Sequence, residues 1–277
     1  MKQKAISLLS TLLKGLCIGG TMLVPGVSGG SMAIILGIYD RLISAVSSFF
    51  KNIKANIVFL VVFVLGSLTG MILFANPILK LLEMFYMPMI YFFIGAVAGS
   101  APMIYRQSGS RKISWKTFIY PIVGFIIVFA VSMIPVNNIY NTENVNITTY
   151  ILLVTVGIAA AIALVLPGIS VSYMFLLFGM YETVIKSIKE LDFKFLLPLA
   201  AGLIIGIILT TKILESAMKK FPEASYMIIL GFILGSVAQI FPGLPSGVDI
   251  IICIITFIIG FTAIYLLSGL ENKNDNI

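Results

Sequence analysis

Gly19-Gly-Thr-Met-Leu-Val-Pro-Gly-Val-Ser-Gly-Gly-Ser-Met32 interrupts a long apolar run, and this interruption decides how the chain can fold. Five of its fourteen residues are glycine, accompanied by a proline, two serines and a threonine. Glycine and proline break helices, and backbone groups freed in hydrocarbon are costly unless protein or water satisfies them. We therefore expect a broken helix that lines a cavity rather than a lipid-facing span.

The composition predicts an all-α polytopic membrane protein. The chain has 277 residues, of which 60% are hydrophobic and 10% charged, and its mean hydropathy is +1.11. Much of the net charge of +7 falls in loops, where it reports orientation, and no basic stripe with interleaved aromatic residues indicates nucleic-acid binding. Histidine is absent and the two cysteines stand far apart, so we expect no cofactor, no metal and no histidine-dependent enzyme chemistry.

Charged residues flank the break on both sides. Along straight helices, Asp40 and Arg41 would lie about 14 Å past it and Lys14 about 16 Å before it. Half of a bilayer core is roughly 15 Å thick, so complete crossings would leave these charges near the midplane, which is costly. A re-entrant hairpin over residues 5–50, with its tip near the midplane and a second helical arm over 31–50, is the cheaper geometry.

The rest of the chain divides into apolar segments separated by charged or polar loops. Spans are expected at 57–76, 87–105 and 118–135, then an external linker at 137–149, a second hairpin at 150–185, and spans at 195–211, 226–241 and 248–267. Basic residues gather in 106–116 and 212–220, and basic loops favour the cytoplasm, so both termini are expected there.

The two breaks are copies of each other. An offset of 142 residues aligns Leu23-Val-Pro-Gly-Val-Ser28 with Val165-Leu-Pro-Gly-Ile-Ser170 and places Asp40 on Glu182. An offset of 136 then aligns the glycine-containing segments 95–100 and 231–236. Each repeat (1–136 and 150–270) is thus a hairpin plus three spans, and the odd number of crossings makes the repeats inverted. This pattern is typical of secondary transporters, with the site between the repeats.

Some repeated glycines have a simpler explanation. Gly66, Gly70, Gly202 and Gly206 are spaced by four residues with no proline between them, which is typical of close helix packing. Packing alone remains an alternative for the breaks as well.

Each break is expected to open a helix whose first N–H groups are unpaired, which favours an anion and phosphate above all. Ser28, Ser31, Ser170 and Ser172 could cap these helices or donate to the ligand. Helix dipoles alone would not offset the burial of a phosphate, so a cation is also required. Arg41 is the first candidate, since guanidinium matches phosphate geometry; the alternative is an interfacial anchor paired with Asp40.

Asp40 and Glu182 are open to two interpretations: they could carry a coupling proton, or they could cap the hairpin arms. The segment Gly26-Val-Ser-Gly29 also resembles the motif of rhomboid intramembrane proteases, but those enzymes need a histidine that this chain lacks.

The run 19–33, with Gly37-Ile-Tyr-Asp-Arg-Leu-Ile43 behind it, closely resembles the PopT family of bacterial polyprenyl-phosphate transporters. The likeness covers nearly the whole chain. It implies a flippase in the bacterial cytoplasmic membrane that returns undecaprenyl phosphate from the outer to the cytoplasmic leaflet for cell-wall polymer synthesis, with membrane lipids and a second copy in a homodimer as further partners.

The resemblance assigns the phosphate to residues of both breaks, namely Pro25, Gly26, Ser28, Gly29, Gly30, Ser31, Arg41, Pro167, Gly168, Ser170 and Ser172, with Asp40 and Glu182 as coupling candidates. The second repeat has Val171, Tyr173 and Thr183 where the first has Gly29, Ser31 and Arg41, so the first repeat is expected to bind more of the phosphate. Two other functions stay open: a transporter of a small soluble anion, and a scaffold for wall enzymes that moves nothing.

Overall fold

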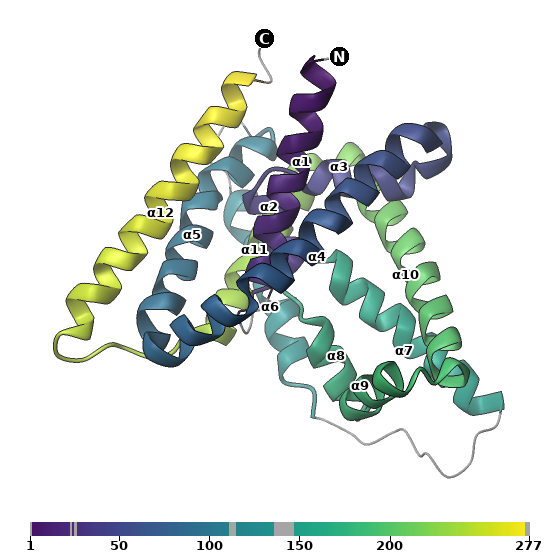
Figure 1. Cartoon of the computed structure of the whole chain (residues 1–277). Coiled ribbons are helices and arrows are strands. Elements are labelled where there is room, and N and C mark those ends of the chain that lie inside the picture. The colour runs from purple at the N-terminus through teal and green to yellow at the C-terminus, as the bar shows by residue number, and fades with distance from the viewer. Residues whose placement is uncertain (1, 23, 25–26, 111–114, 136–146, 275–277) are drawn as a thin grey trace.

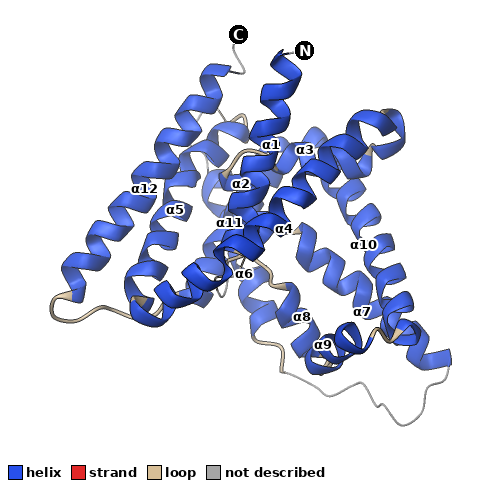
Figure 2. Cartoon of the chain, in the orientation of Figure 1, coloured by secondary structure: helices blue, strands red, loops and turns tan. Residues whose placement is uncertain are grey.

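The structure is a computed structural model that describes residues 2–22, 24, 27–110, 115–135 and 147–274, and the regular structure of this part is helical, with no strand (Figure 2). Its helices are α1 (Lys2–Thr21), α2 (Gly29–Ile35), α3 (Tyr39–Ser47), the 3-10 turn η1 (Phe49–Lys51), α4 (Ile53–Met84), α5 (Tyr86–Gln107), α6 (Trp115–Ser132), α7 (Ile147–Val165), α8 (Val171–Leu177), α9 (Tyr181–Glu190), α10 (Phe193–Lys220), α11 (Pro222–Ile240) and α12 (Asp249–Asn274). The predicted all-α membrane fold is confirmed, since six helices are long and apolar enough to cross a bilayer.

The second arm of each predicted hairpin is two short helices, so the prediction of a continuous arm is wrong. The axes of α2 and α3 differ by 117°, and those of α8 and α9 by 110°. The cause is a glycine at each bend, because Gly37 has φ +62° and Gly179 has φ +67°, a region that other residues rarely adopt. Distances along a straight arm, such as the 14 Å estimated to Arg41, therefore do not apply.

Within each half, two long helices pack backbone against backbone. A Cβ added to Gly66 would lie 2.4 Å from the carbonyl oxygen of Leu12, and one added to Gly202 would lie 2.1 Å from that of Val154. Side chains at these positions would hold the helices apart, so α4 lies on α1, and α10 on α7, through glycine seams. The interpretation of Gly66, Gly70, Gly202 and Gly206 as packing glycines is confirmed.

Similar seams join helices from different halves. A Cβ on Gly95 of α5 would lie 2.1 Å from the carbonyl oxygen of Phe257 on α12, and a Cβ on Gly231 of α11 would lie 2.1 Å from that of Pro121 on α6. Gly95 and Gly231 are separated by the repeat offset of 136 residues, and so are Pro121 and Phe257. Residues that correspond in the two halves thus make corresponding contacts.

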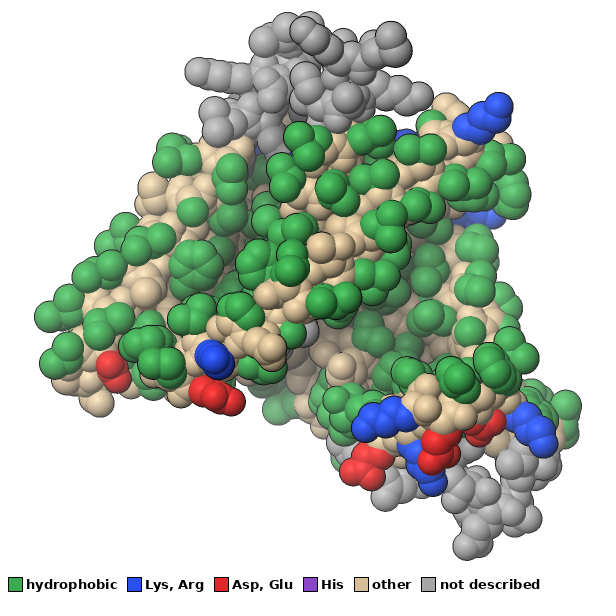
Figure 3. Space-filling view, in the orientation of Figure 1, with side chains coloured by type: hydrophobic (Ala, Val, Ile, Leu, Met, Phe, Trp, Pro, Cys, Tyr) green, Lys and Arg blue, Asp and Glu red, His purple; other side chains and the backbone are tan. Residues whose placement is uncertain are grey.

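The short helices of the two halves lie toward opposite ends of the molecule. In Figure 1 the first residues of α1 and the last of α12 lie at one end, with α3 near them, whereas α8 and α9 lie toward the other end. Figure 3 shows the visible face covered by hydrophobic side chains, with charged side chains gathered near its upper right and lower edges. This distribution is expected for a surface that contacts lipid.

The packing of α3 has no equal counterpart in the other half. The short helix α3 packs against α10, but α9 does not pack against α4 in the same way. The molecule is therefore closed where α3 meets α10, and Figure 3 shows a hollow between the lower part of α4 and the α8–α9 region.

Candidate functional site

The two sequence breaks meet in the middle of the molecule. A Cβ added to Gly30 would lie 3.3 Å from the Cα of Pro167, so the start of α2 touches the break of the second half. The hydroxyl of Tyr39 donates a hydrogen bond of 2.7 Å to the carbonyl oxygen of Val165, at the end of α7. Predicted site residues far apart in the sequence are thus neighbours; Pro25 and Gly26 lie outside the described residues.

The two breaks differ in their local hydrogen bonds. The side chain of Ser170 caps α8 by accepting from the N–H of Tyr173 at 3.4 Å, whereas the side chain of Ser28 makes no such bond to α2. The hydroxyl of Tyr173, which aligns with Ser31, bonds the carbonyl oxygen of Ser132 at 3.0 Å, at the end of α6. In the second break, the side chains of Ser170 and Tyr173 are therefore hydrogen-bonded within the protein. In the first break, the hydroxyl of Ser28 does not cap its helix.

Gly168 has a fixed structural role in the second break. It has φ +86°, and a Cβ at this position would lie 2.2 Å from the carbonyl oxygen of Phe232 on α11. Only glycine fits both the conformation and the contact.

Among the buried side chains that the structure describes, Ser31 is the one whose polar atom has no hydrogen-bond partner. It is 3% exposed, and its Oγ has no hydrogen-bond partner in the structure. A buried hydroxyl without a partner costs about 1–3 kcal/mol, so an oxygen in this state indicates a site where a ligand or water completes the bonding.

A cavity of about 260 Å³ borders both breaks and is almost wholly apolar. Its walls include Gly29 and Gly30 of α2 and Leu164 and Val165 of α7. Thr211 also lines it, but its hydroxyl is bonded to the carbonyl oxygen of Ile207 in its own helix at 2.7 Å. No charged side chain lines this cavity, so it suits hydrocarbon better than a phosphate.

Asp40 and Arg41 lie away from this cavity, and their described partners are other residues rather than each other. Asp40 accepts a hydrogen bond of 2.6 Å from the hydroxyl of Tyr226 on α11. The guanidinium of Arg41 lies over the ring of Phe59 on α4, 4.8 Å from its centroid. Arg41 lines two other cavities, and residues at the start of α4 form part of the wall of both.

The remaining predicted residues of the second half do not join this group. Ser172 and Glu182 are both exposed, the first on α8 and the second on α9. Since α9 lies away from α3 in Figure 1, Asp40 and Glu182 do not form one site in this structure.

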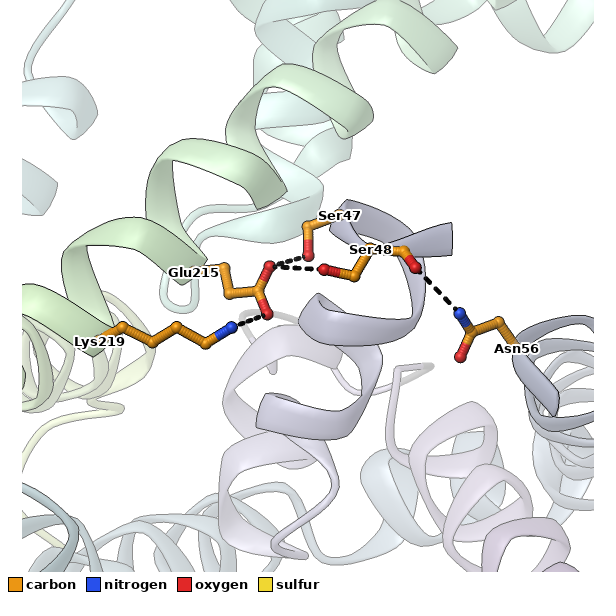
Figure 4. Close-up of polar contacts among 5 residues, drawn as sticks. All are labelled: Ser47, Ser48, Asn56, Glu215 and Lys219. Carbon is orange, nitrogen blue, oxygen red and sulfur yellow. Dashed lines mark hydrogen bonds and ion pairs between the residues drawn. The ribbon is translucent and has the colours of Figure 1, made fainter. Parts of the chain in front are cut away.

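A polar cluster that the sequence does not predict joins α3 to α10 (Figure 4). The carboxylate of Glu215 accepts hydrogen bonds from the hydroxyls of Ser47 and Ser48, the latter at 3.4 Å, and pairs with the ammonium of Lys219 at 2.6 Å. The available signal was an acidic residue four positions before a lysine at the end of an apolar helix, which by itself is common on helix surfaces.

Comparisons with known proteins agree with one another. The model of a family described as VCA0040-like, undecaprenyl phosphate translocase-like, matches residues 18–246. A polyprenyl-phosphate transporter of Staphylococcus aureus is 31% identical over 275 residues, which cover 95% of this chain and 97% of that protein. A polyprenyl-phosphate transporter of Vibrio cholerae is 31% identical over 256 residues, which cover 87% of this chain and 80% of that protein. No solved structure matches the chain.

Proposed function

Because the chain belongs to the undecaprenyl phosphate translocase-like family, we propose that it carries undecaprenyl phosphate from the outer to the cytoplasmic leaflet of the bacterial membrane. Its relatives in Staphylococcus aureus and Vibrio cholerae are named polyprenyl-phosphate transporters, which supports this substrate class over a soluble anion. In this role the protein returns the lipid carrier for reuse in cell-wall polymer synthesis.

The meeting of the two breaks is the observation that carries the proposal. Gly30 lies against Pro167, and the unpaired hydroxyl of Ser31 lies three residues after Ser28 in the same break. A scaffold has no use for two interrupted helices that converge inside the protein. A transporter needs them, since irregular backbone at membrane depth is tolerated where it lines a substrate path.

The two repeats act as inverted copies in this proposal. Their corresponding glycines make corresponding contacts, and α3 and α9 lie toward opposite ends of the molecule in Figure 1. Each hairpin then reaches the membrane midplane from its own leaflet, and both termini lie in the cytoplasm.

The head and tail of the lipid use different parts of the site. The phosphate passes the breaks, where Ser28, Ser31 and Ser170 and the neighbouring backbone N–H groups donate to it. The apolar cavity of about 260 Å³ takes the isoprenoid unit next to the phosphate, and the rest of the tail stays in the bilayer, where each CH₂ gains about 0.8 kcal/mol.

Asp40 and Glu182 have two candidate roles. The hydrogen bond from Tyr226 to Asp40 supports a structural role for Asp40 in holding α3 against α11. The exposure of Glu182 leaves it accessible to solvent protons, which suits a coupling residue. Assembly into a homodimer stays a prediction from the sequence.

Flipping of labelled undecaprenyl phosphate in proteoliposomes tests this function. Removal of one charged or polar contact to the phosphate costs enough to slow flipping by about tenfold or more, so we expect this loss in Ser28→Ala/Arg41→Ala. Thr69→Ala is the matched control, since its exposed hydroxyl bonds only its own helix, at Leu65.

Two results would contradict the proposed transport of prenyl phosphate. Wild-type protein that flips no lipid would favour the scaffold, and uptake of inorganic phosphate that prenyl phosphate does not inhibit would favour a soluble-anion transporter. Unchanged flipping by the double variant would remove Ser28 and Arg41 from the phosphate path while leaving the function in place.

A further inference from the structure

The helix α3 separates two cavities of opposite character. Leu42, Ile43 and Val46 line the apolar cavity beside the breaks. Arg41 and Ser44 lie on a different face, and together with Ser48 just after the helix they line a cavity of about 310 Å³ where α3, η1, α4 and α10 meet. Every residue that lines this second cavity is polar or charged, so the two faces of α3 suit the two ends of an amphiphile.

Cationic side chains from several elements gather around the polar cavity. Arg41 comes from α3, Lys51 from η1 and Lys219 from α10. An adjoining cavity of about 540 Å³ shares Arg41 and Asn52 with it and adds Lys54 of α4, while Leu8, Ala55, Val58 and Phe59 give it an apolar wall. We call these two cavities together the basic vestibule. They fall in the size range of ligand sites, which begins at about 300 Å³.

The carboxylate of Glu215, which lines the vestibule, already has an ion-pair partner and two hydrogen-bond donors. Glu215 pairs with Lys219 at 2.6 Å and accepts from Ser47 and Ser48, as Figure 4 shows. Within the described part of the chain, Arg41, Lys51 and Lys54 pair with no carboxylate. Because Lys219 neutralises Glu215, the three remaining cations give the two joined cavities a net positive charge, which favours a multivalent anion.

Local contacts fix the backbone that carries the exposed Lys51 and Lys54, and one contact supports the side chain of Arg41. Asn56 is 4% exposed and donates hydrogen bonds to the carbonyl oxygens of Ser48 and Phe49, at 3.2 and 3.1 Å, which fixes the turn that carries Lys51. The side chain of Asn52 caps α4 by accepting from the N–H of Ala55 at 3.4 Å. The ring of Phe59 supports the guanidinium of Arg41 from α4.

We propose that the basic vestibule binds the phosphate monoester head of the lipid, as a second site beside the breaks. A phosphate monoester carries about −1.5 to −2 charges at pH 7, which matches the three unpaired cations better than the single charge of a phospholipid diester. A guanidinium and two ammonium groups supply planar and point-charge donors to its oxygens. The inference rests on the proposed function, and it places the head at the α3 end of the path, after it leaves the breaks.

Calorimetric titration of the full-length protein in phosphatidylcholine nanodiscs tests the vestibule, with farnesyl phosphate as probe. Loss of two charge-assisted contacts in Lys51→Gln/Lys54→Gln is expected to raise the Kd by about tenfold or more. Farnesol, which has the same tail and no phosphate, should bind both proteins alike. The conservative pair Lys51→Arg/Lys54→Arg should restore the wild-type Kd to within about twofold.

The matched control is Lys186→Gln/Lys189→Gln, which removes two exposed lysines from α9. An equal loss of affinity in this control would show a general surface-charge effect and overturn the proposal. So would an equal loss for phosphatidylglycerol, which would assign the vestibule to membrane lipids, or an unchanged Kd in Lys51→Gln/Lys54→Gln.

The outcome is separable from the test of the proposed function. Specific loss of farnesyl phosphate binding in a protein whose wild type flips no lipid would keep the vestibule and reject transport. Normal flipping by wild type, with unchanged binding by Lys186→Gln/Lys189→Gln and by Lys51→Gln/Lys54→Gln, would keep transport and reject the vestibule.

Discussion

The hydroxyl of Ser31 separates stability from function at the scale of one residue. Most buried polar groups are paired, and removal of one partner from such a pair is costly. Ser31 has no partner to lose, because its Oγ is buried and unbonded within the start of α2. A variant at this position therefore tests the ligand without disturbing the fold.

In Ser31→Ala the unpaired hydroxyl is replaced by hydrogen, so we expect the free energy of unfolding to stay the same or to rise by about 1 kcal/mol. Lipid flipping should fall by about tenfold if the phosphate is the missing partner. Thermal unfolding in detergent and the proteoliposome assay measure the two effects. A lower stability together with normal flipping would show that Ser31 only supports the packing of α2.

The sequence could identify Ser31 but not its environment. Repeat alignment selects both breaks, since Pro-Gly-x-Ser recurs at the same offset. It could not predict that Tyr173 would bond the end of α6 while Ser31 bonds nothing, because that depends on which helix packs beside each break. The position of Arg41 over Phe59 was missed for a related reason, since the bend at Gly37 re-aims α3.

At the scale of the element, the four long helix pairs depend on glycine. Sequence spacing predicted this packing correctly for α4 and α10, because small residues at intervals of four form one helix face. It did not predict the bends between α2 and α3 or between α8 and α9, because a glycine in an apolar run is also compatible with a straight helix.

Gly70→Ala tests a glycine seam. The new Cβ would lie 2.0 Å from the carbonyl oxygen of Leu16, so α1 and α4 must separate, and we expect a loss of about 1–3 kcal/mol in the free energy of unfolding. Leu73→Ala on the same helix is the control, because this side chain is 58% exposed and touches the seam little. Denaturant titration in detergent compares the two. Equal losses would mean that the seam does not govern the stability of the pair.

At the scale of the whole molecule, the two predicted hairpins are related in sequence but unequal in contact. Ser47 of α3 bonds Glu215 of α10 and closes one end of the molecule, whereas α9 does not pack on α4. The repeat offsets place Lys189 where Ser47 stands and Leu79 where Glu215 stands. In an inverted-repeat transporter the other conformation exchanges the two arrangements, so α9 should approach α4 at these positions.

Cysteine pairs detect the exchange in a background with Cys17→Ala and Cys253→Ala. A short bifunctional crosslinker should join Ser47→Cys to Glu215→Cys in the conformation described above, and should join Lys189→Cys to Leu79→Cys only after a conformational change. Either crosslink is expected to stop lipid flipping, because each holds one end closed. Full flipping with the first pair joined would show that α3 and α10 stay together throughout transport.

The glycine seams also determine which parts of the chain can bend. A contact between two backbones has no side-chain rotamers that could rearrange. Each pair of helices joined in this way therefore moves as one rigid body. A conformational change must then occur at the turns between these helix pairs. Each predicted hairpin has one such turn, at Gly37 in the first half and at Gly179 in the second. In each half, the three residues between the two short helices would thus change conformation most during transport. Restricting the backbone of this turn should slow transport without loosening the packing of the long helix pairs.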